Sequence, residues 1–257
     1  MQQPVQRERV IVGNWKMYKT IDQAFAFIDQ IAPLVTSDHC RVMLAVPFTA
    51  IHAVADKAKG TKLIIGAQNM NDASEGAFTG EVSASMLKDA GASFVLLGHS
   101  ERRTYFSENN EFINRKLKRA LSSGLQPILC IGETRQEHDQ QQTQDVLRRQ
   151  LSECLAGITT DSKGSLIVSY EPVWAIGTGV AAVPSVAEEA QQFCRQLLQE
   201  LFGEESAMKI PILYGGSVDA GNAQNYLAEK NIDGLLIGSA SLVTESFAKI
   251  IELGQNI

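Results

Sequence analysis

Eight short apolar runs, separated by amphipathic segments, constrain the fold of this chain more than any other feature of its sequence. The runs are rich in Val, Ile and Leu and are almost continuously hydrophobic, as expected of parallel strands that are covered on both faces. Short strands at this spacing indicate an α/β protein. The runs cover residues 10–12, 42–46, 63–67, 94–97, 128–131, 166–170, 210–214 and 235–237.

The segments between the runs carry the start and stop signals of helices. Two pairs match the capping box, one residue suits a first helical turn, and one glycine suits a helix end. The capping-box pairs are Thr20 with Gln23 and Thr134 with Glu137, the first-turn residue is Pro184, and the glycine at a helix end is Gly203. Eight strands alternating with helices can close into a barrel or remain an open doubly wound sheet.

The length of the chain favours the closed form. A (β/α)8 barrel typically needs about 250 residues in a single domain, and this chain has 257. No linker or low-complexity tract divides it, so we expect residues 1–257 to form one (β/α)8 barrel domain.

Charge and cysteine spacing restrict the class of function. With 23 basic and 29 acidic residues the net charge is −6, which disfavours generic binding to nucleic acid or to an anionic membrane. No apolar run approaches the length of a membrane span, and none suits a signal peptide, so we expect a cytoplasmic protein. The four cysteines lie too far apart for a zinc or redox motif, which predicts reduced structural thiols and no metal.

Polar residues follow several of the predicted strands directly. In a barrel the active site lies at the carboxyl ends of the strands, so these residues are the candidates for chemistry. Taken singly, a Glu, a His or a Lys in such a place is more often structural or solvated, and glycine clusters also serve tight turns. The segments are Asn14-Trp15-Lys16, Gly98-His99-Ser100-Glu101-Arg102-Arg103, residues 171–179, Gly215-Gly216-Ser217-Val218 and Gly238-Ser239-Ala240-Ser241-Leu242.

Together, in this order and at this spacing, these segments resemble the motifs of the triosephosphate isomerase family, and the similarity runs over essentially the whole chain. The resemblance implies a TIM barrel and the interconversion of dihydroxyacetone phosphate and glyceraldehyde 3-phosphate through an enediolate. It implies a triose phosphate substrate, no cofactor and no metal.

The resemblance also assigns roles to individual residues. Glu171 is the expected general base. His99 precedes an apparent helix start at Ser100, whose dipole disfavours a charged imidazole, so it is expected to act as a neutral hydrogen-bond donor. The other histidines, His39, His52 and His138, have ordinary contexts.

The remaining assignments concern charge and phosphate. Lys16 is expected to stabilise the developing negative charge with Asn14 beside it, and Glu101 to support Lys16. Backbone N–H groups after strands seven and eight are expected to hold the phosphate. The expected substrate- and phosphate-binding residues are Asn14, Lys16, Gly177, Ser217, Gly238 and Ser239.

Two loops complete the resemblance. Residues 172–179 resemble the family's lid, which excludes water from the enediolate and so prevents loss of its phosphate. Residues 68–80 form a long connection that resembles the family's interdigitating loop, which implies a homodimer with Thr79 at the interface.

Two positions depart from the family pattern. Ser239 stands where glycine is common, and Val183 replaces a more usual threonine that would cap the next helix.

Two other functions are alternatives to the isomerase. One is a Schiff-base aldolase with Lys16 as its covalent residue, and the other is a catalytically silent barrel that acts as a binding protein.

Overall fold

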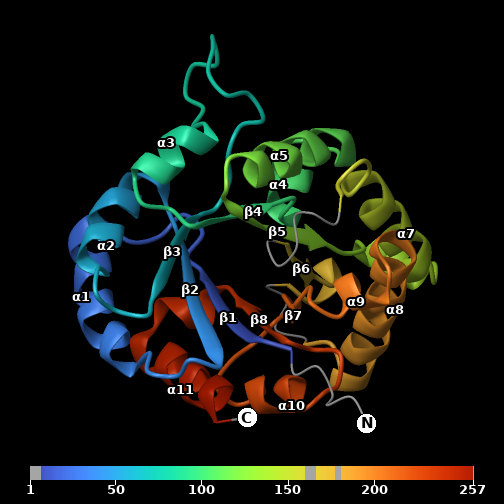
Figure 1. The fold of residues 1–257 in the computed structure, drawn as a ribbon. Coiled ribbons are helices and arrows are strands. Elements are labelled where there is room, and N and C mark those ends of the chain that lie inside the picture. The colour runs from blue at the N-terminus through green and yellow to red at the C-terminus, as the bar shows by residue number, and fades with distance from the viewer. Residues whose placement is uncertain (1–6, 160–165, 177–180, 257) are drawn as a thin grey trace.

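The computed structural model describes residues 7–159, 166–176 and 181–256, and its strands form a closed barrel (Figure 1). Each strand pairs in parallel with the next, and the eighth returns to pair with the first. The predicted barrel is therefore confirmed, and the open doubly wound sheet is wrong. The strands are β1 (Arg9–Asn14), β2 (Cys40–Val46), β3 (Ile64–Ala67), β4 (Phe94–Leu97), β5 (Gln126–Ile131), β6 (Ile167–Tyr170), β7 (Ile212–Tyr214) and β8 (Gly234–Ile237).

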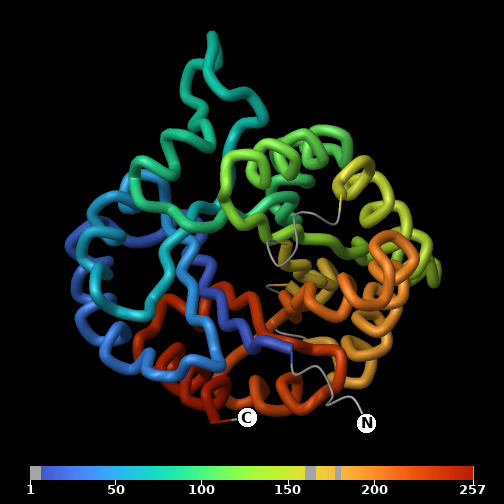
Figure 2. The backbone as a smooth tube through the Cα atoms, viewed as in Figure 1, coloured from blue at the N-terminus to red at the C-terminus, as the bar shows by residue number. Residues whose placement is uncertain are grey.

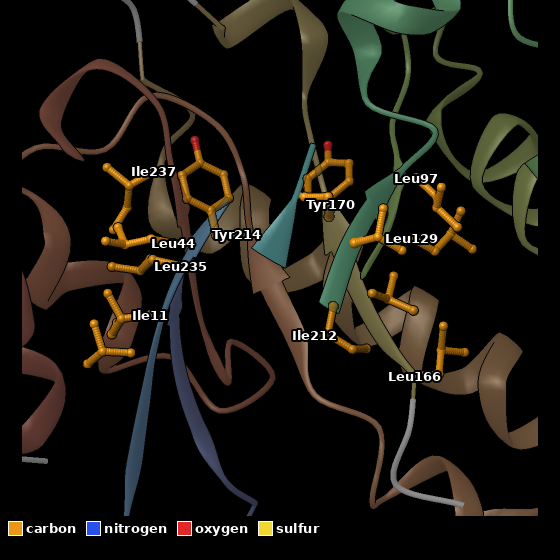
Figure 3. Close-up of a cluster of buried hydrophobic side chains, with 14 of the residues drawn as sticks. Ile11, Leu44, Leu97, Leu129, Leu166, Tyr170, Ile212, Tyr214, Leu235 and Ile237 are labelled. Carbon is orange, nitrogen blue, oxygen red and sulfur yellow. The ribbon is translucent and has the colours of Figure 1, made fainter. Parts of the chain in front are cut away.

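Both faces of these strands are buried, which explains why their sequences do not alternate between polar and apolar residues. Ile11 of β1 belongs to a large cluster that includes helix residues such as Phe27, whereas Val10 and Val12 belong to a second cluster drawn from the strands. Successive strand residues point to opposite faces. The first cluster therefore fills the layer between sheet and helices, part of which Figure 3 shows, and the second fills the barrel interior.

The helices form a ring outside the sheet (Figure 2). The connections between strands and helices also contain short 3₁₀ helices: η1 (Ala32–Leu34), η2 (Phe48–Ala50), η4 (Val173–Ala175) and η5 (Ser239–Leu242). The α-helices are α1 (Ile21–Ile31), α2 (Ile51–Lys57), α3 (Ala84–Asp89), α4 (Ser100–Tyr105), α5 (Asn110–Ser122), α6 (Arg135–Asp139), α7 (Thr143–Cys154), α8 (Pro184–Phe202), α9 (Glu204–Ala207), α10 (Ala223–Leu227) and α11 (Thr244–Gln255).

The predicted helix boundaries are confirmed by their hydrogen bonds. At α6 the backbone N–H of Thr134 donates to Glu137 Oε2 at 2.9 Å, and the N–H of Glu137 donates to Thr134 Oγ1 at 3.3 Å. At α1 the N–H of Thr20 donates to the side chain of Gln23 at 2.9 Å. Gly203 ends α8 with φ of 79°, a conformation that glycine adopts without strain.

The start of α8 lacks a side-chain cap. Val183 is the N-cap residue, its backbone is extended, and its side chain makes no capping hydrogen bond. Valine has no oxygen to accept the N–H groups that the first helical turn leaves unpaired.

Replacing Val183 with threonine is expected to raise the free energy of unfolding by about 1 kcal/mol, because the hydroxyl can accept one of these N–H groups. For a chain of this size that corresponds to a rise in Tm of roughly 2–4 °C, measured by calorimetry. Val183→Ala is the control, since it shortens the exposed side chain without adding an acceptor. Equal Tm values for the two variants would contradict the capping argument.

The four cysteines are buried and unpaired. Burial raises the pKa of the Cys40 thiol to about 11 and that of Cys194 to about 12. Burial, together with the nearby Glu171 carboxylate, raises the pKa of Cys130 well above its usual range. These groups are therefore thiols at neutral pH.

Among the described residues, no helix is both long and apolar enough to cross a membrane.

Candidate active site

A cavity of about 200 Å³ lies at the carboxyl ends of the strands. Its lining includes most of the residues that the sequence singled out, carried there by β1, β4, β6, β7 and β8. Gly177 lies outside the described residues, and Thr79 lies in the loop after β3 and does not line the cavity. The lining residues are Asn14, Lys16, Tyr18, His99, Glu171, Ile176, Gly215, Gly216, Ser217, Val218, Leu236, Gly238, Ser239 and Leu242.

Glu171 follows the last residue of β6 and is 1% exposed. Its Oε2 accepts the backbone N–H of Ser100 at 3.1 Å, at the first turn of α4. Its Oε1 has no hydrogen-bond partner among the described residues. A buried carboxylate oxygen without a donor has free lone pairs that can accept a proton inside the cavity.

Two glycines make room for this carboxylate. A Cβ atom on Gly132 would lie 1.8 Å from the carbonyl oxygen of Glu171, and one on Gly215 would lie 2.8 Å from its Cγ. Neither distance leaves space for a methyl group. The positions of the Glu171 backbone and side chain therefore depend on the absence of side chains at residues 132 and 215.

His99 is the N-cap residue of α4, and its hydrogen bonds fix the place of its proton. Its Nδ1 accepts the backbone N–H of Glu101 at 3.2 Å, so the ring proton of the neutral form lies on Nε2. Nε2 lies 3.5 Å from Glu171 Oε1. The predicted helix start at Ser100 is confirmed, and the ring can donate a hydrogen bond into the cavity.

Lys16 and Asn14 form a compact unit at the end of β1. The Lys16 backbone N–H donates to Asn14 Oδ1 at 3.0 Å, and Lys16 has φ of 51°, a left-handed conformation that is unfavourable for a lysine. The Lys16 ammonium lies 2.6 Å from Glu101 Oε1. Glu101 therefore contacts Lys16 directly, which is the supporting contact that the sequence predicts.

The turns after β7 and β8 face the same cavity. A Cβ atom on Gly238 would lie 3.8 Å from Lys16 Nζ, so this turn lies close to the ammonium. Ser239 begins η5, and it is not among the described residues that have positive φ. The departure from glycine at residue 239 therefore causes no backbone strain, and the serine N–H remains available.

Comparison with known proteins identifies the family. The sequence model described as Triosephosphate isomerase matches residues 9–254. The chain belongs to the triosephosphate isomerase family. It is 54% identical over 254 residues to the triosephosphate isomerase of Protochlamydia amoebophila, covering 99% of this chain and 96% of that protein. It is 47% identical over 247 residues to that of Carboxydothermus hydrogenoformans, covering 96% and 98%.

A solved structure of this family has the same architecture. The crystal structure of triosephosphate isomerase from Bartonella henselae superposes with a TM-score of 0.88 at 35% identity, covering 96% of this chain and 98% of that one. The resemblance that the sequence indicated, to triosephosphate isomerases and their barrel, is therefore confirmed.

A buried cluster beside η4 was not predicted from the sequence. Glu133 is fully buried, and its Oε1 accepts Trp174 Nε1 at 2.7 Å and the Tyr170 hydroxyl at 3.1 Å. The imidazole of His138 stacks on Trp174 with ring centroids 4.2 Å apart. His138 lies in α6, as its helical context predicted, but its contact with Trp174 was not predicted. Its helical position gave no signal of this contact, because α6 and Trp174 meet only in the folded barrel.

Proposed function

We propose that this protein interconverts dihydroxyacetone phosphate and glyceraldehyde 3-phosphate, with Glu171 as the general base. The observation that carries this proposal is the buried Glu171 carboxylate, whose Oε1 lacks a donor and lies 3.5 Å from His99 Nε2. A base and a neutral donor side by side suit a reaction that moves one proton on carbon and another on oxygen.

Both proton transfers follow from this arrangement. Glu171 removes a proton from C1 of dihydroxyacetone phosphate. The electron pair of that C–H bond forms a double bond between C1 and C2, and the π pair of the carbonyl group moves onto its oxygen to give an enediolate. His99 Nε2–H donates to that oxygen and exchanges protons between the two oxygens. Glu171 then returns a proton to C2. A neutral histidine donor is a known feature of the triosephosphate isomerase family.

Lys16 supplies the positive charge for the enediolate. Its ammonium lies at the cavity wall beside Gly238, and the charge is fixed before the reaction begins. A preorganised cation stabilises the transition state more than water does, because no reorganisation is needed. The pairing with Glu101 holds the ammonium in place, and Asn14 holds the Lys16 backbone.

Backbone N–H groups are proposed to bind the phosphate. Ser217, Gly238 and Ser239 line the cavity in the turns after β7 and β8, where barrels commonly bind phosphate. Gly177, from the lid, is the fourth proposed donor. With the lid closed over the phosphate, the enediolate cannot expel phosphate into water.

The two alternative functions are not favoured. A Schiff-base aldolase needs a free amine on Lys16, whereas the Lys16 ammonium pairs with a carboxylate at 2.6 Å. A silent binding protein has no need for Asn14, Lys16, His99 and Glu171 in one cavity.

A coupled isomerase assay on the purified protein tests the activity. Trapping with borohydride and substrate should leave Lys16 unlabelled, and labelling of Lys16 would support the aldolase instead.

A homodimer is proposed because the loop over residues 68–80 projects from the barrel with an exposed tip (Figure 1). Phe78 is 51% exposed and Thr79 is exposed beside it. The loop is preshaped, since Asn71 Nδ2 donates to Glu81 Oε2 at 2.7 Å across its base. Met17, after β1, and Met86, in α3, are also exposed, at 94% and 57%.

Light scattering is expected to give twice the chain mass of 28.0 kDa at working concentrations. Replacing Phe78 with aspartate places a charge on the exposed tip, and it should shift the protein to monomer and lower its activity. Ala73→Asp, at the half-buried base of the same loop, is the matched control for added charge. An active monomer of the unaltered chain would contradict the proposed homodimer.

One domain and a cytoplasmic location complete the proposal. All eight strands belong to one closed sheet, which supports a single domain over residues 1–257. The four unpaired thiols, Cys40, Cys130, Cys154 and Cys194, suit a reducing compartment.

A further inference from the structure

Lys19, in the segment between β1 and α1, makes contacts that the proposed chemistry does not use. Its backbone has φ of 72°, in the left-handed region that a lysine adopts only at a cost in free energy. Its ammonium donates to the backbone carbonyl of Leu242 at 3.0 Å, across 223 residues of sequence. Leu242 is the last residue of η5, the turn that follows β8. A strained backbone persists only where the surrounding structure compensates for it, and the bond to Leu242 is one such contact.

Two aromatic rings lie beside the Lys19 ammonium. It is 4.7 Å from the centroid of the Phe27 ring and 5.4 Å from that of the Trp15 ring. Both rings are buried and pack edge to face, with centroids 5.2 Å apart. A cation is attracted to the faces of such rings. Among the residues that the structure describes, no carboxylate pairs with this ammonium, so the two rings and the Leu242 carbonyl fix its position.

η5 carries part of the proposed phosphate site. Its first residue, Ser239, lines the cavity, and so does Leu242 at its end. The turn packs closely on β1, because a Cβ atom on Gly13 would lie 3.0 Å from Ser241 Cβ. The hydrogen bonds inside a 3₁₀ turn have poor geometry, so its position depends on outside contacts of this kind. β1 supplies one of them, and Lys19 supplies another at the last carbonyl.

We propose that Lys19 is a positioning residue that holds η5, and with it the phosphate-binding turn after β8, against the segment after β1. The inference rests on the proposed isomerase function. With the Leu242 carbonyl held by the ammonium, the Ser239 N–H keeps a fixed place relative to Lys16, which lies in the same segment as Lys19. Loss of the ammonium loosens the end of η5 and leaves the base and the histidine in place.

The test is Lys19→Met, which keeps a side chain of similar length against the rings and removes the donor. We expect KM for glyceraldehyde 3-phosphate to rise about two- to tenfold, as loss of one hydrogen bond implies. The value of kcat should change little, because weaker phosphate binding affects substrate and transition state alike. The dissociation constant for inorganic phosphate, measured by titration calorimetry, should rise by the same factor as KM.

Three controls separate positioning from charge and from stability. Lys19→Arg keeps a cationic donor and should recover most of the phosphate affinity. Lys57→Met is the matched control, because Lys57 also lies over a ring, 5.2 Å from the Phe25 centroid, and does not line the cavity. It should leave KM and phosphate binding unchanged. Unphosphorylated glyceraldehyde offers no phosphate to η5, so its kcat/KM should be equal in Lys19→Met and the unaltered chain.

Ionic strength distinguishes a misplaced turn from a lost attraction. Salt screens the pull of a distant charge on phosphate, but it does not restore a lost hydrogen bond. The ratio of the KM of Lys19→Met to that of the unaltered chain should therefore be the same at low and at high salt. A ratio that falls to one at high salt would overturn the positioning role.

Phosphate titration needs no turnover, so the two proposals fail separately. An inactive unaltered chain would refute the proposed function. Equal dissociation constants for inorganic phosphate in Lys19→Met and the unaltered chain would refute the positioning role, even if Tm falls. An equal loss of kcat/KM with glyceraldehyde and with its phosphate would refute it as well.

Discussion

Replacing Glu171 with glutamine is expected to lower kcat/KM by about 10³-fold, because an amide cannot take a proton from carbon. That loss corresponds to about 4 kcal/mol of transition-state stabilisation. Glutamine has the same shape, and its carbonyl oxygen can still accept the Ser100 N–H that Glu171 Oε2 accepts at 3.1 Å. The coupled isomerase assay measures the change.

The same substitution should not lower the free energy of unfolding. Glu171 is buried and its Oε1 has no donor, so the neutral amide removes a poorly solvated charge. Activity is thus expected to fall while Tm stays equal or rises. Glu200→Gln is the control, since that carboxylate is exposed and pairs with Arg148 on the outer surface. Retained activity in Glu171→Gln would refute the assignment of the base.

Replacing Lys16 with methionine is expected to lower kcat/KM by roughly 10²–10³-fold, the usual cost of losing one preorganised group that stabilises developing negative charge. Methionine keeps the length of the side chain and removes the ammonium. KM should rise as well, because the lysine also attracts the phosphate dianion. Steady-state kinetics at fixed ionic strength measure both effects.

Lys249→Met controls for the loss of one positive charge. Lys249 pairs with Glu252 on the exposed face of α11, and neither residue lines the cavity. Glu101 loses its partner in Lys16→Met, but its side chain is 40% exposed and remains hydrated, so stability should change little. Lys16→Met and Lys249→Met with equal kinetics would refute the role of Lys16.

The strands could be predicted from the sequence because both of their faces are buried. Their observed bounds differ from the predicted runs by at most two residues, and most differences have local causes. Strand pairing extends to polar residues such as Arg9 and Gln126 at the rim of the barrel, beyond the apolar runs. β7 begins late, at Ile212, because Pro211 has no N–H to donate.

The candidate site was predictable where residues lie next to strand ends, and not elsewhere. Asn14, His99 and Glu171 each follow or end a strand, so their position in sequence implies their position in the fold. Tyr226 lies at an apolar position of a short helix, and in sequence it resembles any core tyrosine. The Tyr226 hydroxyl donates to the carbonyl of Ala182, 44 residues away, and so joins α10 to the segment before α8, which only the folded barrel brings together.

The pairing of β1 with β8 means that the barrel cannot close until the last strand has been synthesised. Val10 pairs with Gly234, and a side-chain bond beside that seam, from Arg9 to the Ile232 carbonyl, spans 223 residues. A ribosome adds about 5–20 residues per second, so β1 waits roughly 10–45 seconds for its second neighbour. During that time one hydrogen-bonding edge of β1 is open to other strands. Newly synthesised chains are therefore exposed to aggregation through this edge until β8 has been added.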